Sequence, residues 1–509
     1  MTKMRRLGML LILISLVFIF AFASMDEDDS SQCERVVRKW AESSSNTEIE
    51  ENKLNLKDLL FFLHVPRTGG RTYFHCFLRK LYVSSDECPR SYDKLRFDPR
   101  KPKCRLLSSH DDYSLMSKLS KEKTSVVTIL RNPIERVFST YEFAVEVAAR
   151  FLVHPNLTSA TQMSGRIARR SRGISTLDIW PWKYLVPWMR EDLFARRDAR
   201  KHVNITSIKS TQDPYNMQEV VMPLEVFIDD PVAHEIIHNG ATFQLAGLTN
   251  NSCLPESHLV RQCVRRYPAL GSYVLEIAKS RLDNMLYIGI TEEHKASATI
   301  FAIMVGSQVI SQSDALSSHI QEAASNKTRT NAFQNFKDDG LNQEQHSTDD
   351  EQHGDEFSSV HAETSKIMTV EKLMETYESC ISSLRETQAK RHALSLQRIA
   401  PANFSKEARH QVPLHVIRKI TSMNGLDMAL YEHGQHLFMQ QQKYLTKNIQ
   451  TNLEGQQWRL PSQFERQLTS DNLYDFITWK VISLPLMALL LIFVFVIVTT
   501  RRRTLKVKV

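Results

Sequence analysis

Two short segments carry arginine and hydroxyl residues, the first together with glycines, in the pattern of an anion-binding site. The first, PRTGGRT at residues 66–72, follows the apolar run 59–65 and precedes a helical stretch over 73–82. Glycines let the backbone approach a ligand, and free N–H groups at a helix N-terminus attract an anion. A plain turn is the alternative interpretation, and the absent GK[ST] ending excludes a Walker A loop. The candidate phosphate-binding residues are Arg67, Thr68, Gly69, Gly70, Arg71 and Thr72.

The second segment is the strand-like run SVVTIL at residues 125–130, followed by Arg-Asn-Pro at 131–133. Proline suits the first turn of a helix, where its missing N–H would have no partner. We therefore expect a helix that continues to about Glu146. Arg131 at the strand end and Ser139 two turns into the helix are placed to bind a second anionic group. By itself, Arg131 is equally typical of an ordinary ion pair.

Both segments need a strand before them and a helix after them. A continuous apolar run such as LLFFLHV at 59–65 is typical of a strand buried on both faces of a parallel sheet. We predict an α/β protein with a central parallel sheet flanked by helices. Its two anion sites lie at the carboxyl ends of strands, where such folds bind ligands. Further helical patterns cover 368–397 and 425–445.

The two ends of the chain carry membrane signals. Residues 1–24 have a basic start, an apolar middle and small residues at A-x-A spacing, which predicts a cleaved signal peptide; an uncleaved anchor is the alternative. Residues 481–500 hold no charge and can span the ~30 Å hydrocarbon core as a helix. The tail 501–509 is basic, and positive charge stays cytoplasmic. We predict a single-pass type I membrane protein with a lumenal body.

Composition divides the lumenal body into three parts. Residues 25–55 read as a polar stalk, 56–445 as the folded domain and 446–480 as a stem. Within the domain, 309–366 is rich in Ser, Gln, Asn, Asp and His and lacks apolar periodicity. Such a segment buries too little apolar surface to order itself, so we predict a disordered acidic insertion.

The net charge indicates an anionic partner for the lumenal body. The formal charge of +8 equals the eight cations at the two termini, and nine acidic residues lie in 338–363 without Lys or Arg, so the rest of the chain carries +9. A basic body attracts anions. Because a lumenal protein does not meet the genome, we expect no nucleic-acid partner.

The cysteines and sequons are typical of a secretory protein. All seven cysteines lie on the predicted lumenal side, where disulfides persist. Cys88/Cys104 and Cys253/Cys263 are the nearest pairs along the chain, but the pairing does not follow from sequence, and one thiol is left over. No C-x-x-C or His cluster suggests a metal site, so we expect none. The Asn-x-Ser/Thr sequons, typical of a glycoprotein, are at Asn156, Asn204, Asn250, Asn326 and Asn403.

The combination of a PxTGG-type loop with a strand that ends in R-[DN]-P-x-x-R-x-x-S resembles the sulfotransferases that use 3′-phosphoadenosine-5′-phosphosulfate (PAPS). The resemblance implies their fold, with the first loop on the 5′-phosphosulfate and Arg131 and Ser139 on the 3′-phosphate. The segments similar to heparan sulfate 6-O-sulfotransferases are 64–72, 110–115, 127–139, 285–292 and 426–438. The type I layout departs from those type II glycan enzymes and resembles the plant tyrosylprotein sulfotransferases.

The resemblance also implies catalytic roles. A tyrosine phenol has a pKa of about 10 and needs a base as it attacks, and the resemblance assigns that role to His110. Asp111 and Asp112 are alternative bases, or orient the imidazole. Arg67 replaces the family's usual lysine at the leaving phosphate; a guanidinium stays protonated, so it acts by charge and hydrogen bonds. Arg71 adds a cation, and Arg136 either joins the phosphate site or pairs with an acid.

The acceptor side is less defined by sequence. Trp182 and Trp188 form an aromatic wall for tyrosine or pack in the core. A basic stretch attracts acidic peptide flanks or is a solvated helix face; it comprises Arg166, Arg169, Arg170, Arg172, Arg196, Arg197, Arg200 and Lys201. The leading hypothesis is a Golgi-lumenal enzyme that transfers sulfate from PAPS to tyrosines of secreted peptides. A glycan O-sulfotransferase is the alternative, and a non-enzymatic peptide- or glycan-binding ectodomain is the distant one.

Overall fold

The computed structural model describes residues 29–45, 52–88, 104–153, 180–189, 213–216, 222–315, 368–399 and 404–453. The chain divides into two units, residues 1–438 and 439–509. In the second unit the described part is the end of one long helix, up to Leu453. The sheet and all the residues of the candidate site belong to the first unit.

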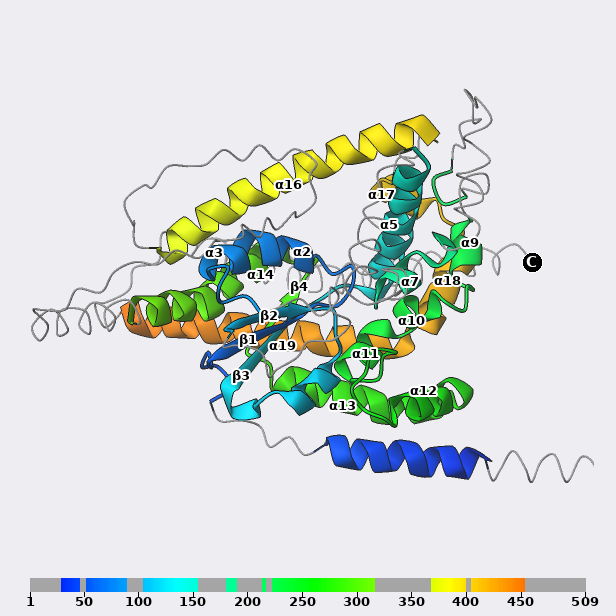
Figure 1. The fold of residues 1–509 in the computed structure, drawn as a ribbon, viewed down its shortest axis with the longest axis horizontal. Coiled ribbons are helices and arrows are strands. Elements are labelled where there is room, and N and C mark those ends of the chain that lie inside the picture. Colours follow the sequence, from blue (N-terminus) through cyan, green and yellow to red (C-terminus); the bar gives the residue numbers. More distant parts are fainter. Residues whose placement is uncertain are drawn as a thin grey trace, which may run out of the picture. The chain divides into compact units, whose positions relative to one another are not determined.

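Four parallel strands form the sheet at the centre of the first unit (Figure 1). Their order is β2-β1-β3-β4, and the register pairs Phe61 with both Leu107 and Val126. The predicted strands at 59–65 and 125–130 are confirmed, and every residue of β3 is buried, as a central parallel strand requires. The strands are β1 (Leu59–Leu63), β2 (Leu106–Ser109), β3 (Thr124–Leu130) and β4 (Tyr287–Ile290).

A helix follows each of the two predicted binding segments. After β1 the helical stretch begins at Gly70, three residues earlier than the sequence suggests, and runs through α2 (Gly70–Tyr73), a π-helical segment η1 (Phe74–Leu78) and α3 (Arg79–Leu81). After β3, α5 spans Pro133–Val153 and is capped by Asn132, whose Oδ1 accepts from the amides of Ile134 and Glu135 at 3.0 and 3.3 Å. This helix continues two turns beyond the predicted end.

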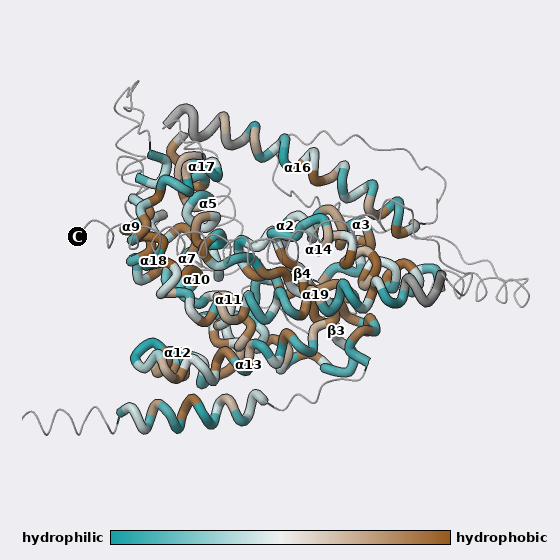
Figure 2. The backbone as a smooth tube through the Cα atoms, turned by 180° about the vertical axis from the view of Figure 1, so that it is seen from behind, coloured by the Kyte–Doolittle hydropathy of each residue, from teal (hydrophilic) through white to brown (hydrophobic). Residues whose placement is uncertain are grey.

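Helices lie on both sides of the sheet, with α2 and α14 on one side and α13 on the other (Figure 1). Helix α16 packs against η1 and α5. Figure 2 shows hydrophobic residues around β3 and β4 and a mostly hydrophilic α16. The remaining elements are η2 (Tyr113–Lys118), η3 (Lys121–Lys123), α7 (Trp182–Leu185), η5 (Pro187–Met189), α9 (Leu224–Phe227), α10 (His234–Ile237), α11 (Gly240–Leu245), α12 (Ser257–Arg266), η6 (Pro268–Leu270), α13 (Gly271–Asp283), α14 (His294–Phe301), η7 (Ala302–Gly306), α16 (Val370–Ile399), α17 (Lys406–His410), α18 (Leu414–Met423) and α19 (Gly425–Leu453).

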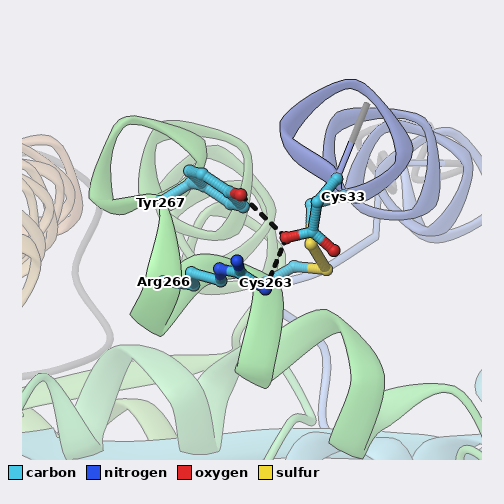
Figure 3. The surroundings of a disulfide bond; sticks show 5 residues. Cys33, Cys263, Arg266 and Tyr267 are labelled. Atoms are coloured by element: carbon cyan, nitrogen blue, oxygen red, sulfur yellow. Dashed lines mark hydrogen bonds and ion pairs between the residues drawn. A yellow bond between two sulfur atoms is a disulfide. The ribbon is translucent and has the colours of Figure 1, made fainter. Parts of the chain in front are cut away.

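A helix over residues 29–44 lies where the sequence predicts a polar stalk. Its apolar residues Val37 and Trp40 are buried, and Cys33 forms a disulfide with Cys263 of α12 (Figure 3). Asp29 accepts a hydrogen bond from Tyr267 at 2.7 Å and pairs with Arg266 at 2.6 Å. The stalk prediction failed here because the few apolar residues on one face of this polar segment have a partner surface that is distant in sequence.

The other disulfides partly confirm the expected pairing. Cys88 pairs with Cys104, as their proximity along the chain suggests. The suggested Cys253/Cys263 pair is wrong, since Cys263 bonds to Cys33 and leaves Cys253 as the free thiol. Cys76 bonds to Cys380 and thereby ties η1 to α16 across 304 residues of sequence.

The prediction of disorder is wrong at the start of the segment 309–366, because residues 309–315 are helical and Val309 is fully buried. The segment 316–367 lies outside the described residues, as do the predicted signal peptide, the transmembrane segment 481–500 and the basic tail. Within the part of the chain that the structure describes, no helix is long and apolar enough to cross a membrane.

Removing the Cys33–Cys263 disulfide by replacing both residues with serine should lower the free energy of unfolding by about 2–5 kcal/mol. The bond joins positions 230 residues apart, so its loss frees a long loop in the unfolded chain and releases the N-terminal helix. Denaturant unfolding of the purified protein measures the change. Cys253→Ser is the matched control and should shift stability by less than about 0.5 kcal/mol. Equal stability of the double variant and the wild type would contradict the assignment.

Candidate active site

The carboxyl ends of all four strands bring the predicted site residues to one edge of the sheet. His64 follows β1, His110 follows β2, Arg131 follows β3 and Thr291 follows β4. The chain passes from β2 over β1 to β3, so the strand order changes direction at β1. Ligands of parallel α/β sheets bind at such a switch point. The sequence-predicted location of the site is therefore where this topology favours binding.

The loop after β1 is shaped to hold an anion. Gly69 adopts a left-handed conformation, with φ +83°, and is the N-cap of α2. An added Cβ at Gly69 would meet nothing nearer than Thr291 Cγ2 at 4.0 Å, so the turn has open space above it. Thr68 is buried and donates to the Val65 carbonyl at 2.9 Å, while Thr291 donates to the Thr68 carbonyl at 2.8 Å. These two hydroxyls fix the loop so that the α2 N-terminus faces the open space.

Arg67 connects the two predicted anion sites. Its Nε and Nη2 donate to the Ser139 hydroxyl at 3.2 and 3.0 Å, and its guanidinium lies 4.5 Å from the centre of the Phe143 ring. Burial, together with the charge of Arg131, lowers the pKa of Arg67 to about 10. The guanidinium therefore stays protonated at neutral pH. Sequence reasoning assigned Arg67 and Ser139 to different phosphates, and the structure places them in direct contact.

Arg131 completes a cluster of closely spaced cations. Its Nη1 donates to the Arg67 carbonyl at 3.3 Å, and ion pairs reach Glu135 at 3.7 Å and Glu292 at 3.9 Å. Burial lowers the pKa of Arg131. Its Nε is buried without a hydrogen-bond partner among the described residues. A buried donor without a partner costs about 1–3 kcal/mol, which a bound anion would recover.

The remaining loop residues differ in exposure. Arg71 is exposed, and its charge contributes to lowering the pKa of Arg67. Thr72 is half-buried, and its amide donates to the Gly69 carbonyl at 3.0 Å. Two arginines, a serine hydroxyl and a helix N-terminus are the donor set that two phosphate-type groups require. The residues present therefore fit a ligand that carries two anionic groups.

Arg136 is not part of this cluster. Its Nη2 donates to Asp427 Oδ2 at 2.7 Å, and both side chains are almost fully buried. The Asp427 carboxylate also accepts from the amides of Ala241 and Thr242 at the start of α11. The alternative that Arg136 pairs with an acid is therefore confirmed. The ion pair fastens α5 to α11 and α19.

His110 has a defined tautomer. Its Nδ1 lies 3.0 Å from the His64 carbonyl, and since a carbonyl only accepts, Nδ1 carries the proton. In the neutral ring the lone pair is then on Nε2. Trp180 Nε1 and Gln244 Nε2 donate to the His110 carbonyl at 2.6 and 2.9 Å and hold this segment of backbone. The arrangement suits a base that accepts a proton at Nε2.

The two carboxylates after His110 have other partners. Asp112 is buried and accepts from both the amide and the hydroxyl of Ser114 and of Thr249. Burial raises its pKa. Asp111 accepts from Ser109 Oγ at 2.8 Å and from Asn251 Nδ2. Both therefore hold loops together, and His110 is the better placed of the three candidate bases.

The two predicted tryptophans differ in burial, although both pack with the core cluster around α5. Trp188 is buried in the core cluster around α5, so for this residue core packing is correct. Trp182 is half-buried and lies 5.8 Å, centre to centre, from Phe143, the ring beneath Arg67. Trp180, which the sequence did not single out, binds the His110 backbone. The basic stretch Arg166–Arg172 and Arg196–Lys201 lies outside the described residues.

Sequence reasoning also missed residues at the site or in the framework that supports it. Glu292 and Asp427 lie inside the segments that resemble sulfotransferases, so this similarity was a usable signal. Gln244, which donates to the carbonyls of His64, His110 and Asp111, had no signal in the sequence.

Over the described ranges no group of three or more His, Cys, Asp or Glu side chains is arranged to hold a metal ion.

An arginine cluster and a histidine at the carboxyl edge of a parallel α/β sheet are typical of an enzyme that binds an anionic ligand. No protein-family model matches the chain. A curated protein-tyrosine sulfotransferase from Arabidopsis thaliana is 52% identical over 523 aligned residues, which cover 100% of both chains. The chain therefore belongs to the protein-tyrosine sulfotransferase family, which confirms the resemblance to the plant enzymes.

Proposed function

We propose that this chain transfers the sulfuryl group of PAPS to tyrosine side chains of secreted peptides and proteins in the Golgi lumen. The observation that carries the proposal is the meeting of Arg67, Arg131 and His110 at one sheet edge. The family membership supports the acceptor, because the Arabidopsis relative is a protein-tyrosine sulfotransferase. The predicted signal peptide and C-terminal transmembrane segment support a type I, membrane-anchored enzyme whose active site is lumenal.

The loop and the start of α5 would hold PAPS. Gly69, Gly70, Arg71 and Thr72 would offer the helix N-terminus to its 5′-phosphosulfate, and Arg131 and Ser139 would bind its 3′-phosphate. Bound PAPS supplies an activated sulfuryl group and a phosphate leaving group. Arg67, in contact with Ser139, would stabilise the charge that develops on the leaving oxygen. Because Arg67 remains protonated, it acts by charge and hydrogen bonds rather than by giving up a proton.

His110 would remove the acceptor proton. A phenol has a pKa of about 10 and is mostly neutral in the lumen, so its oxygen attacks faster as a base takes the proton. Nε2 of His110 is the acceptor atom, because Nδ1–H is committed to the His64 carbonyl. Trp180 and Gln244 limit movement of the His110 backbone and so keep the base in place. Transfer then depends mainly on positioning and on the two arginines.

The aromatic pair Phe143 and Trp182 would contact the acceptor ring. Phe143 supports Arg67, and Trp182 packs on Phe143 two residues after Trp180, which holds His110. The segment 180–182 therefore reaches from the base toward the leaving-group arginine, where the phenol must lie. The net charge of +9 outside the termini and the acidic segment favours substrates with acidic residues around the tyrosine.

The acceptor assay distinguishes the leading function from the glycan alternative. Purified protein with labelled PAPS should label an acidic peptide that contains tyrosine and leave its phenylalanine counterpart unlabelled. The control acceptor is desulfated heparan sulfate. Labelling of the glycan in place of the peptide would support the alternative function, and nucleotide binding without transfer to either would support a non-enzymatic ectodomain.

His110 is proposed as the base and Arg131 as a nucleotide-binding residue, so their alanine variants should lose different properties. His110→Ala should lower kcat by about 10²–10⁴-fold, the usual contribution of a general base, and leave the affinity for the product nucleotide PAP (adenosine 3′,5′-bisphosphate) unchanged. Arg131→Ala should weaken PAP binding by roughly 10- to 100-fold, since a hydrogen bond to a charged group contributes about 1.5–3 kcal/mol. Calorimetry and steady-state kinetics measure both. Near-normal turnover of His110→Ala would show that another group is the base.

Two tryptophan variants separate acceptor contact from core packing. Trp182→Ala should raise KM for the peptide by about 10-fold, equivalent to an aromatic contact of about 1.4 kcal/mol, and leave PAP affinity unchanged. Trp188→Ala is the matched control, and we expect it to lower the free energy of unfolding by about 3–5 kcal/mol instead. An unchanged KM in Trp182→Ala would exclude this residue from the acceptor site.

A further inference from the structure

The His64 side chain lies between the nucleotide loop and the base. Its ring stacks on that of His110, with centroids 4.1 Å apart and planes inclined by 27°. On the other side, a Cβ added to Gly70 would lie 2.2 Å from His64 Cδ2 and 2.4 Å from Nε2. Real Cβ atoms do not approach so closely, so the imidazole lies directly against the Gly70 backbone. One ring therefore touches the start of α2 and the catalytic histidine.

Gly70 is a glycine because of this ring. It is the first residue of α2, and only Gly69 and Gly247 of the described glycines have positive φ. The backbone at Gly70 would accept any L-residue, so the His64 imidazole is what excludes a side chain. Gly70 also contributes to the helix N-terminus that faces the anion.

The His64 backbone reinforces the contact made by its ring. Its carbonyl accepts from His110 Nδ1 at 3.0 Å and from Gln244 Nε2 at 3.2 Å. Phe62 lies 5.5 Å away, centre to centre, and parallel to the His64 ring within 10°. Burial, followed by the charges of His110 and Arg67, lowers the pKa of His64 well below its usual value. The ring is therefore neutral and adds no charge to the cationic cluster.

We propose that His64 is a positioning residue that couples the nucleotide-binding turn to His110. Its imidazole acts as a spacer that sets the separation between the Gly70 backbone and the His110 ring. The imidazole thereby sets the distance between a nucleotide bound at the turn and the base His110. The inference rests on the proposed function, because it assumes that a nucleotide binds at this turn and that His110 is the base.

A double-mutant cycle tests the coupling. Gly70→Ala should weaken PAP binding at least 10-fold, because the new methyl group displaces the turn or the imidazole. His64→Ala should leave PAP affinity within about 3-fold of wild type and lower kcat about 100-fold, the loss expected for a base displaced by about 1 Å. The combined variant should regain the PAP affinity lost in Gly70→Ala, because the methyl group fits where the imidazole was, but keep the low kcat of His64→Ala. A purely structural role of His64 would lower stability and PAP affinity together with kcat, rather than kcat alone in His64→Ala.

Gly425→Ala is the matched control, since Gly425 begins α19 and an added Cβ there meets nothing within 4 Å. It should change neither PAP affinity nor kcat. If His64→Ala does not bind PAP at all, His64→Asn, a smaller change, takes its place in the cycle. Additive losses in the combined variant, or near-normal kcat without the imidazole, would overturn the coupling. Failure of the wild type to bind PAP would instead overturn the proposed function.

Discussion

The repulsion between Arg67 and Arg131 is the constraint that the surrounding structure must satisfy. The Arg131 guanidinium donates to the Arg67 backbone, and each side chain is largely removed from water, where like charges repel strongly. Four carboxylates compensate for this charge, namely Glu135, Glu142, Glu146 and Glu292. Three of them are held by a residue from a distant part of the chain. Arg409 of α17 contacts Glu135 and binds both oxygens of Glu142 at 2.8 Å, and Tyr431 donates to Glu292 at 2.9 Å.

Through these contacts α17 and α19 contribute to the site, although neither helix contains one of the two predicted anion-binding segments. Arg409 keeps Glu135 and Glu142 from neutralising the arginines fully, so net positive charge is left for an anionic ligand. The buried Arg136–Asp427 pair serves the same framework, since it aligns α5 with α11. Removing one partner of such a pair would leave an uncompensated charge in the interior and cost about 3–5 kcal/mol. Buried ion pairs and charged hydrogen bonds, as well as apolar packing, therefore hold the elements of the site together.

The elements that the sequence predicted well are those whose signal is local. The apolar runs at 59–65 and 125–130 are strands because each is buried on both faces, and Pro133 begins a helix because its fixed φ and missing N–H suit a first turn. The prediction was poorest where a polar segment has a distant partner. Residues 29–44 form a docked helix, and Cys263 bonds to Cys33 rather than to the nearer Cys253, because disulfides form between residues close in space.

The sequence by itself indicated the chemical groups of the site: a glycine–arginine loop, a second arginine at a strand end and a histidine in a segment that resembles sulfotransferases. It could do so because backbone approach, helix N-termini and donor side chains are properties of short segments. The tertiary structure decided how these groups combine. It placed Ser139 on Arg67, gave Arg136 to Asp427, and set the His64 ring between Gly70 and His110. These contacts span up to 291 residues of sequence, and only packing of the whole domain brings their partners together.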